Sequence, residues 1–345
     1  MTNPLSADLD HILEHTRELW EELRGERIFI TGGTGFFGCW LLESLLWAND
    51  RLNLDCRATV LSRSPDLFRA KAPYLAGHKI ISILQGDIRT FDFPNGKFSH
   101  VIHAAMETNV NLQNPSALTY FDSAVLGTRH VMDFARSAGT QQVLFTSSGA
   151  VYGRQPPEIT TIGEEYRGAP YPSEIKLAYG QSKRAAEFLC TAYSELYNIK
   201  VKICRCFAFS GPYLPLDSGF AIGNFLRDVL YGNSIYVNGD GTPYRSYLYA
   251  ADLAIWLWTI FFRGDSTRAY NVGSENALSI AQLAETVRNV VLPESAIVIS
   301  KQPDPGRVPE RYVPSIQRAH DELGLSEWIG LEEGIKRMAK WHLEK

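Results

Sequence analysis

The stretch Thr31-Gly32-Gly33-Thr34-Gly35-Phe36-Phe37-Gly38 decides the fold of this chain. A short apolar run at residues 27–30 precedes it, and a segment with helix-periodic apolar residues at 40–46 follows it. A strand, a glycine turn and a helix in this order form the context that a dinucleotide-binding loop requires. The sequence therefore predicts that this turn holds the phosphates of a dinucleotide.

Each glycine in the turn has a separate physical role. Gly32 lets the chain turn, Gly35 lets the backbone approach a pyrophosphate, and Gly38 lets the helix pack closely on the strand. The N-terminus of the helix presents N–H groups and a positive dipole end to the phosphates. We therefore expect this loop to contact the cofactor through Gly32, Thr34, Gly35, Phe36, Phe37 and Gly38.

Composition places the chain among ordinary globular proteins. It has 345 residues, of which 45% are hydrophobic and 21% are charged. The formal charge of −4 argues against nucleic acid or a membrane surface as a partner. The apolar run at 253–262 is too short to span a bilayer, and no signal peptide is seen, so we expect a cytoplasmic protein. The five cysteines lack neighbouring metal ligands, and no metal site is expected.

Beyond the glycine turn, short apolar runs alternate with helical patterns. The runs lie at 58–61, 80–84, 99–103 and 142–145. This alternation predicts an α/β fold with a doubly wound parallel sheet. Ligands of such sheets bind at the carboxyl ends of the strands. Residues 1–25 predict a helical extension that packs on the outer face of this domain or on a partner subunit.

The tip of the second strand bears on the choice of cofactor. Ser62 and Arg63 follow the run at 58–61, and no acidic residue occurs before Asp66. A carboxylate here would bind the ribose 2′-hydroxyl of NAD(H), whereas an arginine pairs with the 2′-phosphate of NADP(H). We therefore expect Ser62 and Arg63 to contact the cofactor and favour NADP(H), with NAD(H) as the alternative.

The next two strand ends carry further candidates for the cofactor site. Asp87, followed by Ile88, can accept a hydrogen bond from the adenine amino group. Ala104 and Ala105 are small enough to let the cofactor lie against the backbone. His103 stands inside a strand end with no evident partner acid or base, so we expect it to be structural.

Tyr179 and Lys183 are the strongest catalytic candidates. They lie four residues apart in a helical segment and therefore share one helix face. A phenol with a pKa near 10 is a poor acid–base catalyst at neutral pH, but a neighbouring ammonium stabilises the phenolate. Ser148, at the end of a buried strand, can donate to the substrate oxygen. We therefore expect Ser148, Tyr179 and Lys183 to form a redox site.

These motifs resemble the extended short-chain dehydrogenase/reductase family, and within it the nucleotide-sugar epimerases and dehydratases. The likeness covers about residues 26–325. It rests on the glycine loop, the Ser-Ser-x-x-Val-Tyr-Gly strand end, the Tyr-x-x-x-Lys helix, and the segments 205–212, 239–248 and 270–273.

The resemblance implies a second role for Tyr179 and Lys183, which also hold the cofactor, and it implies a substrate and a domain arrangement. The substrate is a nucleoside-diphosphate sugar whose diphosphate pairs with Arg245, and the protein is a homodimer built on two helices of each subunit. An NAD(P)-binding Rossmann domain spans 26–204 with a returning segment near 236–262, and a smaller substrate-binding domain combines 205–235 and 263–345. The expected substrate contacts are Met106, Ser148, Gly149, Asn224, Arg245 and Arg311.

The chain departs from the family pattern where the choice of reaction is made. The 4,6-dehydratases follow the active Ser or Thr with an acid and a base, but this chain has Gly149 and Ala150 there. Neither can transfer a proton, which disfavours dehydration unless another residue such as Glu107 does so. Ala208 replaces an Asn that often contacts the diphosphate, which suggests an altered substrate pose.

The sequence thus favours a nucleotide-sugar epimerase that oxidises its substrate transiently and returns the hydride. The alternative is an NADPH-dependent reductase of a 4-keto-6-deoxy sugar, because Ser148, Tyr179 and Lys183 serve both reactions. A 4,6-dehydratase and a dinucleotide sensor without chemistry are less favoured, since the proton carriers of the first are missing and the catalytic residues that sensors commonly lose are present.

Overall fold

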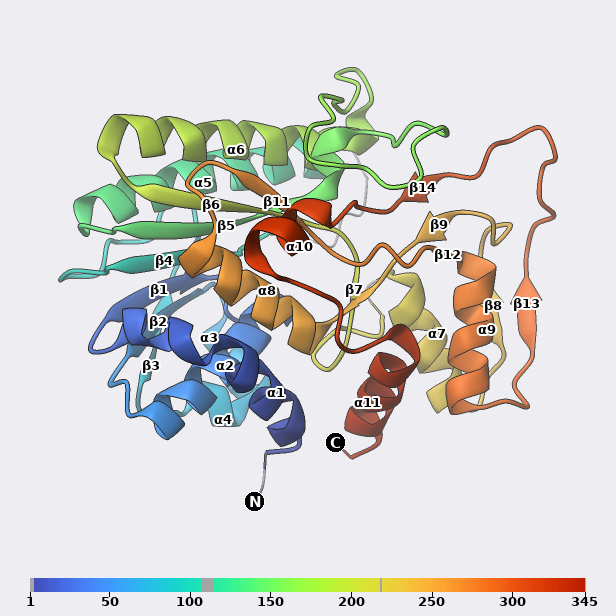
Figure 1. The fold of residues 1–345 in the computed structure, drawn as a ribbon, viewed down its shortest axis with the longest axis horizontal. Coiled ribbons are helices and arrows are strands. Elements are labelled where there is room, and N and C mark those ends of the chain that lie inside the picture. The colour runs from blue at the N-terminus through green and yellow to red at the C-terminus, as the bar shows by residue number, and fades with distance from the viewer. Residues whose placement is uncertain (1–2, 107–114, 218, 345) are drawn as a thin grey trace. The chain divides into compact units, whose positions relative to one another are not determined.

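A seven-stranded sheet organises the chain, as the computed structural model shows for residues 3–106, 115–217 and 219–344 (Figure 1). The strand order is β11-β6-β5-β4-β1-β2-β3, and β1 pairs in parallel with both β2 and β4. The predicted doubly wound fold is confirmed, and the order reverses direction between β1 and β4, where such sheets bind ligands. The strands are β1 (Arg27–Thr31), β2 (Arg57–Ser62), β3 (Ile81–Gln85), β4 (His100–His103), β5 (Gln142–Ser148), β6 (Lys200–Cys206) and β11 (Ala269–Val272).

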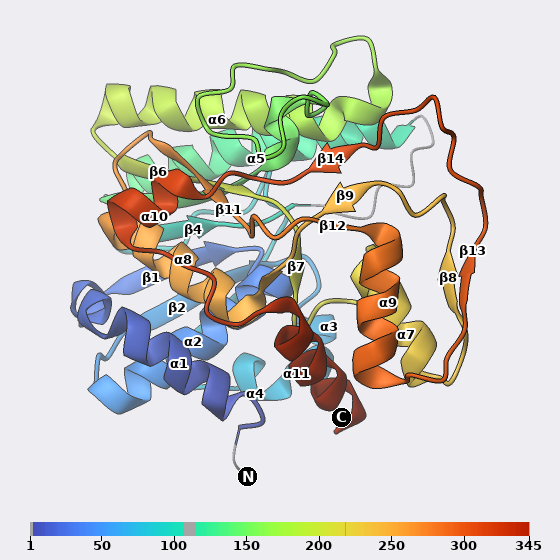
Figure 2. The same cartoon turned by 45° about the vertical axis from the view of Figure 1, so that its right-hand side comes forward.

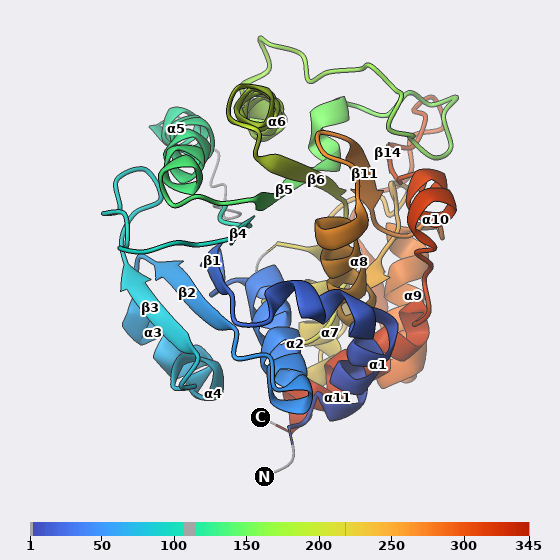
Figure 3. The ribbon, with the colours of Figure 1, turned by 60° about the vertical axis from the view of Figure 1, so that its left-hand side comes forward.

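Helices cover both faces of this sheet. Figure 3 shows α5 and α6 on one face and α1 and α2 on the other. The middles of β1, β4 and β5 are apolar and buried, as expected for a sheet covered on both faces, while polar side chains gather at the strand ends. The helices of this part are α1 (Ser6–Thr16), η1 (Arg17–Leu23), α2 (Phe36–Leu52), α3 (Pro65–Lys71), α4 (Pro73–Ala76), α5 (Pro115–Ser137), η2 (Gly149–Tyr152), η3 (Ile175–Leu177), α6 (Ala178–Tyr197) and α8 (Ala250–Arg263).

The N-terminal helices pack on the sheet domain itself. Trp20 is fully buried, and its ring centroid lies 4.7 Å from that of Trp258 on α8. The Trp258 indole donates to Ser44 Oγ on α2 at 2.8 Å. Glu22 forms an ion pair with Arg263. The extension therefore binds α2 and α8 of its own chain, the first of the two locations expected for it.

The chain divides into two compact units. The first comprises residues 3–106, 115–153, 169–205 and 254–270, and the second 154–168, 206–217, 219–253 and 271–344. The returning segment is thus 254–270, where we expected 236–262, and within it Phe261 and Phe262 of α8 pack against His100 of β4. No helix among the described residues is long and apolar enough to cross a membrane.

The second unit combines three larger helices with short strands. Figure 2 shows α7, α9 and α11 grouped beside the paired strands β8 and β13. The elements are β7 (Phe209–Ser210), α7 (Ala221–Leu230), β8 (Ile235–Val237), β9 (Tyr244–Arg245), β10 (Leu248–Tyr249), β12 (Leu278–Ser279), α9 (Ile280–Val291), β13 (Ile297–Ile299), β14 (Arg311–Tyr312), α10 (Gln317–Leu323) and α11 (Leu331–Leu343).

Candidate functional site

The glycine loop between β1 and α2 has the geometry of a phosphate cradle. A Cβ on Gly32, where φ is +73°, would lie 2.4 Å from the Ala104 carbonyl carbon, and one on Gly38 would lie 2.3 Å from the Gly32 oxygen. Packing within the protein therefore requires both glycines. A Cβ on Gly35 would meet only the Gly32 oxygen, at an ordinary 3.4 Å.

Gly35 thus has no packing reason to be glycine, and the space beside it is open to a ligand. As the N-cap of α2 it also offers no side chain to the N–H groups of the first helical turn, which begins at Phe36. Backbone donors and the positive end of the helix dipole meet at this point, which suits a pyrophosphate. The loop residues present therefore fit a dinucleotide.

A lysine that the sequence did not point to reaches the same loop. Lys71 Nζ, from the last turn of α3, donates to the Thr34 carbonyl oxygen at 3.0 Å. This contact sets an ammonium group beside the loop. No motif in the sequence pairs position 71 with position 34, because their contact depends on how α3 packs after β2.

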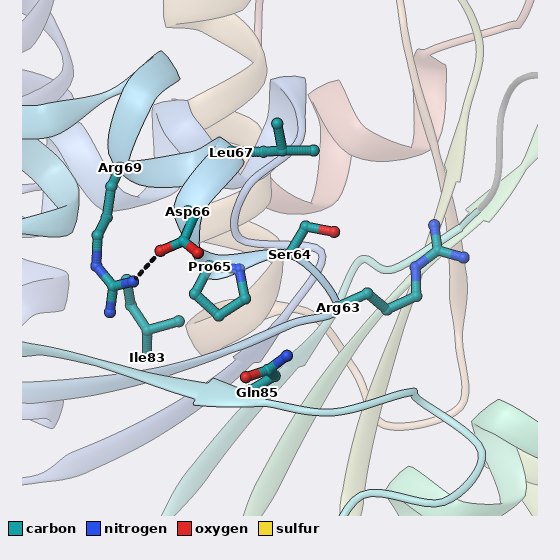
Figure 4. A pocket seen from close by; sticks show the side chains of 8 residues that line it. All are labelled: Arg63, Ser64, Pro65, Asp66, Leu67, Arg69, Ile83 and Gln85. Atoms are coloured by element: carbon teal, nitrogen blue, oxygen red, sulfur yellow. Dashed lines mark hydrogen bonds and ion pairs between the residues drawn. The ribbon is translucent and has the colours of Figure 1, made fainter.

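The tip of β2 opens into a pocket of about 500 Å³ (Figure 4). In Figure 4 the Arg63 side chain extends away from the ion pair that Asp66 makes with Arg69 at 2.7 Å. Ser62 is buried and accepts a hydrogen bond from the Ser64 N–H at 3.2 Å, so its hydroxyl shapes the turn. The pocket is lined by Arg63, Ser64, Pro65, Asp66, Leu67, Arg69, Ile83 and Gln85.

The Asp87 carboxylate is oriented by Arg89, two residues further along the chain. The Arg89 side chain donates to both carboxylate oxygens, at 2.8 and 3.1 Å, and the Arg89 backbone N–H donates a third hydrogen bond at 2.9 Å. The Arg89 side-chain bonds lower the pKa of Asp87, despite an opposing effect of burial. The carboxylate is therefore ionised and oriented. Ile88 packs against Gly127, where an added Cβ would lie 2.8 Å away.

His103 is a structural residue, as expected. Its two ring nitrogens lie 2.9 Å from Thr31 Oγ1 and 2.9 Å from Thr128 Oγ1. Burial first, and the nearby Lys183 charge second, lower the pKa of His103 to about 3, so the ring is neutral. Thr31 Oγ1 also accepts from the Ala105 N–H at 3.2 Å. The network fixes the backbone of the β4 tip, where Ala104, Ala105 and Met106 are half-buried.

The structure places the three catalytic candidates on β5 and the adjoining helix α6. Lys183 is 3% exposed, and its Nζ donates to the Thr146 carbonyl oxygen at 2.6 Å. Ser148 ends β5 and caps η2 by accepting from the Ala150 N–H at 3.1 Å. The half-buried Tyr179 ring lies 5.7 Å from that of Tyr120 on α5.

Close contact between α6 and η2 brings these residues toward one another. A Cβ on Gly180 would lie 2.4 Å from the Ala150 carbonyl oxygen, so only glycine permits this approach. Tyr179 precedes that glycine directly, and Ser148 lies two residues before Ala150. A phenol, a buried ammonium and a hydroxyl on adjoining segments can move a proton to and from a substrate oxygen.

In the second unit, strand register separates two of the expected substrate contacts. Strands β9 and β14 pair in parallel, with Tyr244 opposite Arg311 and Arg245 opposite Tyr312. Residues in register share a face, and neighbours along a strand alternate. The Arg245 guanidinium accordingly lies 5.8 Å from the Tyr312 ring, and that of Arg311 lies 4.2 Å from the Tyr244 ring.

Arg245 and Arg311 therefore occupy opposite faces of this ladder, and their guanidinium groups do not form a single phosphate-binding site within it. Asn224 lies half-buried on α7. Glu107, considered as a proton carrier, lies outside the described residues. Among the residues that the structure describes, no three His, Cys, Asp or Glu side chains form a metal-binding group.

Comparison with known proteins agrees with this geometry. The sequence model of the "NAD dependent epimerase/dehydratase family" matches residues 28–273. UDP-glucuronic acid decarboxylase 6 of Arabidopsis thaliana is 28% identical over 313 residues, which cover 90% of this chain and 87% of that protein.

Solved structures share the fold across almost the whole chain. UDP-glucose 4-epimerase from Thermotoga maritima, solved with UDP-glucose, has a TM-score of 0.77 at 18% identity over 92% of this chain and 99% of its own. UDP-glucuronic acid 4-epimerase from Bacillus cereus, in complex with UDP-glucuronic acid and NAD, has a TM-score of 0.77 at 19% identity over the same shares.

Proposed function

This chain belongs to the NAD-dependent epimerase/dehydratase family, and we propose that it is a nucleotide-sugar epimerase that works by transient oxidation of a sugar hydroxyl. The observation that carries the proposal is the composition of the β5 tip. Ser148 is present there, while Gly149 and Ala150 offer no proton carrier. Tyr179 is then the one acid–base group of this constellation.

The residues of the chain divide the work as follows. Tyr179 takes the proton of the sugar hydroxyl, and the buried Lys183 ammonium stabilises the phenolate that accepts it. Ser148 donates to the same substrate oxygen and fixes its position. A nicotinamide cofactor held by the glycine loop, Tyr179 and Lys183 would supply the hydride-accepting and hydride-donating chemistry. Rotation of the keto sugar between the two transfers inverts the carbon.

Epimerisation needs no further proton carrier, since Tyr179 releases to the product oxygen the proton that it took. Dehydration differs, because a base must remove a proton from carbon and an acid must protonate the leaving hydroxyl. Gly149 and Ala150 can do neither. The β5 tip therefore favours epimerisation over dehydration.

A decarboxylase is the second candidate, because the curated relative named above is a UDP-glucuronic acid decarboxylase. Oxidation next to the carbon that bears a carboxylate creates a β-keto acid, which loses carbon dioxide without a base. The carbon left behind must then gain a proton from an acid or from water. Gly149 and Ala150 do not supply that acid, and this need places the decarboxylase second.

For the cofactor we propose a preference for NADP(H) within a family described as NAD-dependent. Arg63 is exposed just after β2, which ends in Ser62 and not in a carboxylate, and Asp66 of the same pocket is paired with Arg69. A preference for NADP(H) also suits the alternative of a 4-keto-6-deoxysugar reductase, which consumes NADPH. Ser62 contributes by shaping the turn on which Arg63 stands.

For the substrate we propose a nucleoside-diphosphate sugar. Arg245 offers a guanidinium for bidentate contact with a diphosphate, and its in-register neighbour Tyr312 offers an aromatic face. Met106, Gly149 and Asn224 are proposed to line the rest of the site. Arg311 lies on the other face of the β9–β14 ladder, so we propose that it contacts a different part of the substrate from Arg245.

We also propose a homodimer formed through α5 and α6. Leu118 and Leu126 on α5 and Phe188 and Leu196 on α6 are between 51% and 74% exposed in the single chain. Apolar side chains of this size, exposed on two neighbouring helices, mark an interaction surface. Phe188→Asp is expected to halve the mass measured by light scattering.

Product analysis tests the function. UDP-glucose, UDP-glucuronic acid and dTDP-glucose are each incubated with the enzyme and cofactor, and proton NMR identifies the product. An epimer with no net change in reduced cofactor supports the proposal. A pentose nucleotide with carbon dioxide supports the decarboxylase. A net loss of NADPH in a separate incubation with a nucleotide-linked 4-keto-6-deoxy sugar supports the reductase.

A further inference from the structure

A buried cluster of four polar side chains lies beside the proposed catalytic residues. Arg205 on β6 binds both carboxylate oxygens of Glu187 on α6, at 2.8 and 3.0 Å. Ser147 Oγ donates to Glu187 Oε1 at 2.5 Å, and Arg205 also donates to the Tyr152 hydroxyl at 3.0 Å. The Arg205 and Glu187 side chains are 17% and 13% exposed. The cluster is therefore fully paired and largely shielded from water.

The cluster holds the two segments that bear the candidate catalytic groups. Ser147 precedes Ser148, and Tyr152 ends the short helix that Ser148 caps, so both ends of that segment are bound. Glu187 lies one turn beyond Lys183 and about two turns beyond Tyr179, on the same face of α6. Lys183 and Glu187 thus join successive turns of α6 to Thr146 and Ser147 of β5.

We propose that Glu187 and Arg205 form a positioning pair that sets Tyr179 against Ser148 and keeps the electrostatic field at Tyr179 positive. The catalytic roles of Tyr179 and Ser148 in this inference rest on the proposed function. An unpaired Glu187 carboxylate would oppose the Lys183 ammonium one turn away. Arg205 cancels that charge, so the phenolate feels the ammonium alone.

Other groups around these residues leave that balance intact. On neighbouring elements, His103 faces Lys183 as a neutral ring, and Tyr120 faces Tyr179. On α6 itself, Arg184 donates to the Val151 carbonyl oxygen of η2 at 3.2 Å, and burial raises the pKa of the Cys190 thiol, which stays neutral. The Tyr152 hydroxyl accepts a hydrogen bond from Arg205. Just before Tyr179, Lys176 and Glu174 form an ion pair at 3.4 Å that is more exposed to water. The Glu187–Arg205 pair is the better-shielded pair, and its halves shift the field in opposite directions.

Titration of the Tyr179 phenol tests this inference directly. The protein without added cofactor is labelled with carbon-13 tyrosine, and the Tyr179 signal is identified by its loss in Tyr179→Phe. Glu187→Gln leaves Arg205 as an added positive charge and should lower the titration midpoint. Arg205→Gln leaves a negative charge and should raise it. Over the ~12 Å that eight helical residues span, each shift is roughly half to one pH unit.

Three further variants separate charge from structure. Glu187→Gln combined with Arg205→Gln removes both charges and should return the midpoint toward that of the wild type. Arg205→Lys keeps the charge but cannot span Glu187 and Tyr152 together, so the midpoint should stay while turnover falls several-fold. Glu195→Gln, on an exposed turn of α6 more than a Debye length from Tyr179, is the matched control and should shift nothing.

Circular dichroism confirms which variants are folded before they are titrated. If one single variant unfolds, the double variant is compared with the other single variant. The inference is overturned if the titration midpoint of Tyr179 is unchanged in Glu187→Gln and Arg205→Gln, or if it moves in the same direction in both. This test can fail or succeed independently of the test of the proposed function. Opposite midpoint shifts together with full turnover by Tyr179→Phe would retain the positioning pair and remove the epimerase.

Discussion

Lys183 Nζ donates to the Thr146 carbonyl oxygen at 2.6 Å, from a position that is almost completely buried. Lys183 lies one helical turn after Tyr179, and Thr146 lies two residues before Ser148. The bond therefore holds the ammonium group close to the segments that carry both candidate catalytic residues. A buried charge that is hydrogen-bonded in this way acts on its neighbours in a medium less polar than water. This relationship underlies the acid–base role given to Tyr179.

Replacing Tyr179 by Phe should abolish turnover while the protein continues to bind its cofactor. We expect kcat to fall by about a thousandfold, the typical worth of a positioned acid–base group. Tryptophan fluorescence should show that the cofactor still binds, with an affinity lowered only by the lost contact of the Tyr179 hydroxyl. Tyr197→Phe, near the end of the same helix, is the control and should retain wild-type kcat. Wild-type kcat in Tyr179→Phe would contradict the acid–base role of Tyr179, whereas an unchanged biological activity of that variant would favour the dinucleotide sensor without chemistry.

Replacing Arg63 by Glu should reverse the preference between the two nicotinamide cofactors. Loss of one charge-assisted contact with the 2′-phosphate predicts an affinity for NADPH that is about 10- to 100-fold lower. Affinity for NADH should change little, as measured by calorimetry. Arg69→Gln alters the same pocket at a residue already paired with Asp66 and serves as the control. Equal losses for both cofactors would contradict the role of Arg63.

Replacing Trp20 by Ala should destabilise the first unit, because Trp20 is fully buried against Trp258. We expect the free energy of unfolding to fall by ~3–5 kcal/mol, as for other large core side chains. Urea unfolding measures this loss. Tyr231, which is 75% exposed, gives a matched control whose Ala variant should change stability by less than about 0.5 kcal/mol. A loss of similar size in both variants would contradict the anchoring of the N-terminal helices.

His103 should make stability depend on pH. Its pKa is about 3 in the folded protein, against an ordinary value of 6.5. Between these values the unfolded chain binds a proton that the folded protein does not, so the free energy of unfolding falls as the pH drops below 6.5. The slope from this group approaches ~1.4 kcal/mol per pH unit.

Urea unfolding at several pH values between 7 and 5 checks this slope. His103→Gln lacks the titrating group, so its stability difference from the wild type should shrink as the pH falls. A difference that stays constant across this range would show that His103 carries a proton in the folded protein.

The sequence was sufficient for the fold and for the residues at the strand ends. Periodicity and the glycine turn are local signals, so the parallel sheet and the helix bearing Tyr179 and Lys183 could be predicted without coordinates. The structural role of His103 also followed, because no partner acid or base stood near it in the sequence.

Contacts between distant segments could not be predicted in this way. Lys71 reaches Thr34 across 37 positions, and Arg205 reaches Glu187 and Tyr152 from another strand. The opposite faces of Arg245 and Arg311 follow from the register of β9 and β14, which has no local signal. Only the spacing of Glu187 from Lys183, four residues along one helix, could have drawn attention to the cluster.

Turnover in deuterium oxide tests the central claim most directly, namely that Tyr179 carries a proton only to and from a sugar oxygen. Transient oxidation moves hydride between carbon and cofactor and protons only between oxygens, so the epimerised sugar should carry no deuterium on carbon. Mass spectrometry and proton NMR of the product from UDP-glucose or UDP-glucuronic acid read this out. Deuterium at a sugar carbon would contradict the account and reveal a carbanion protonated from solvent, as in decarboxylation or dehydration.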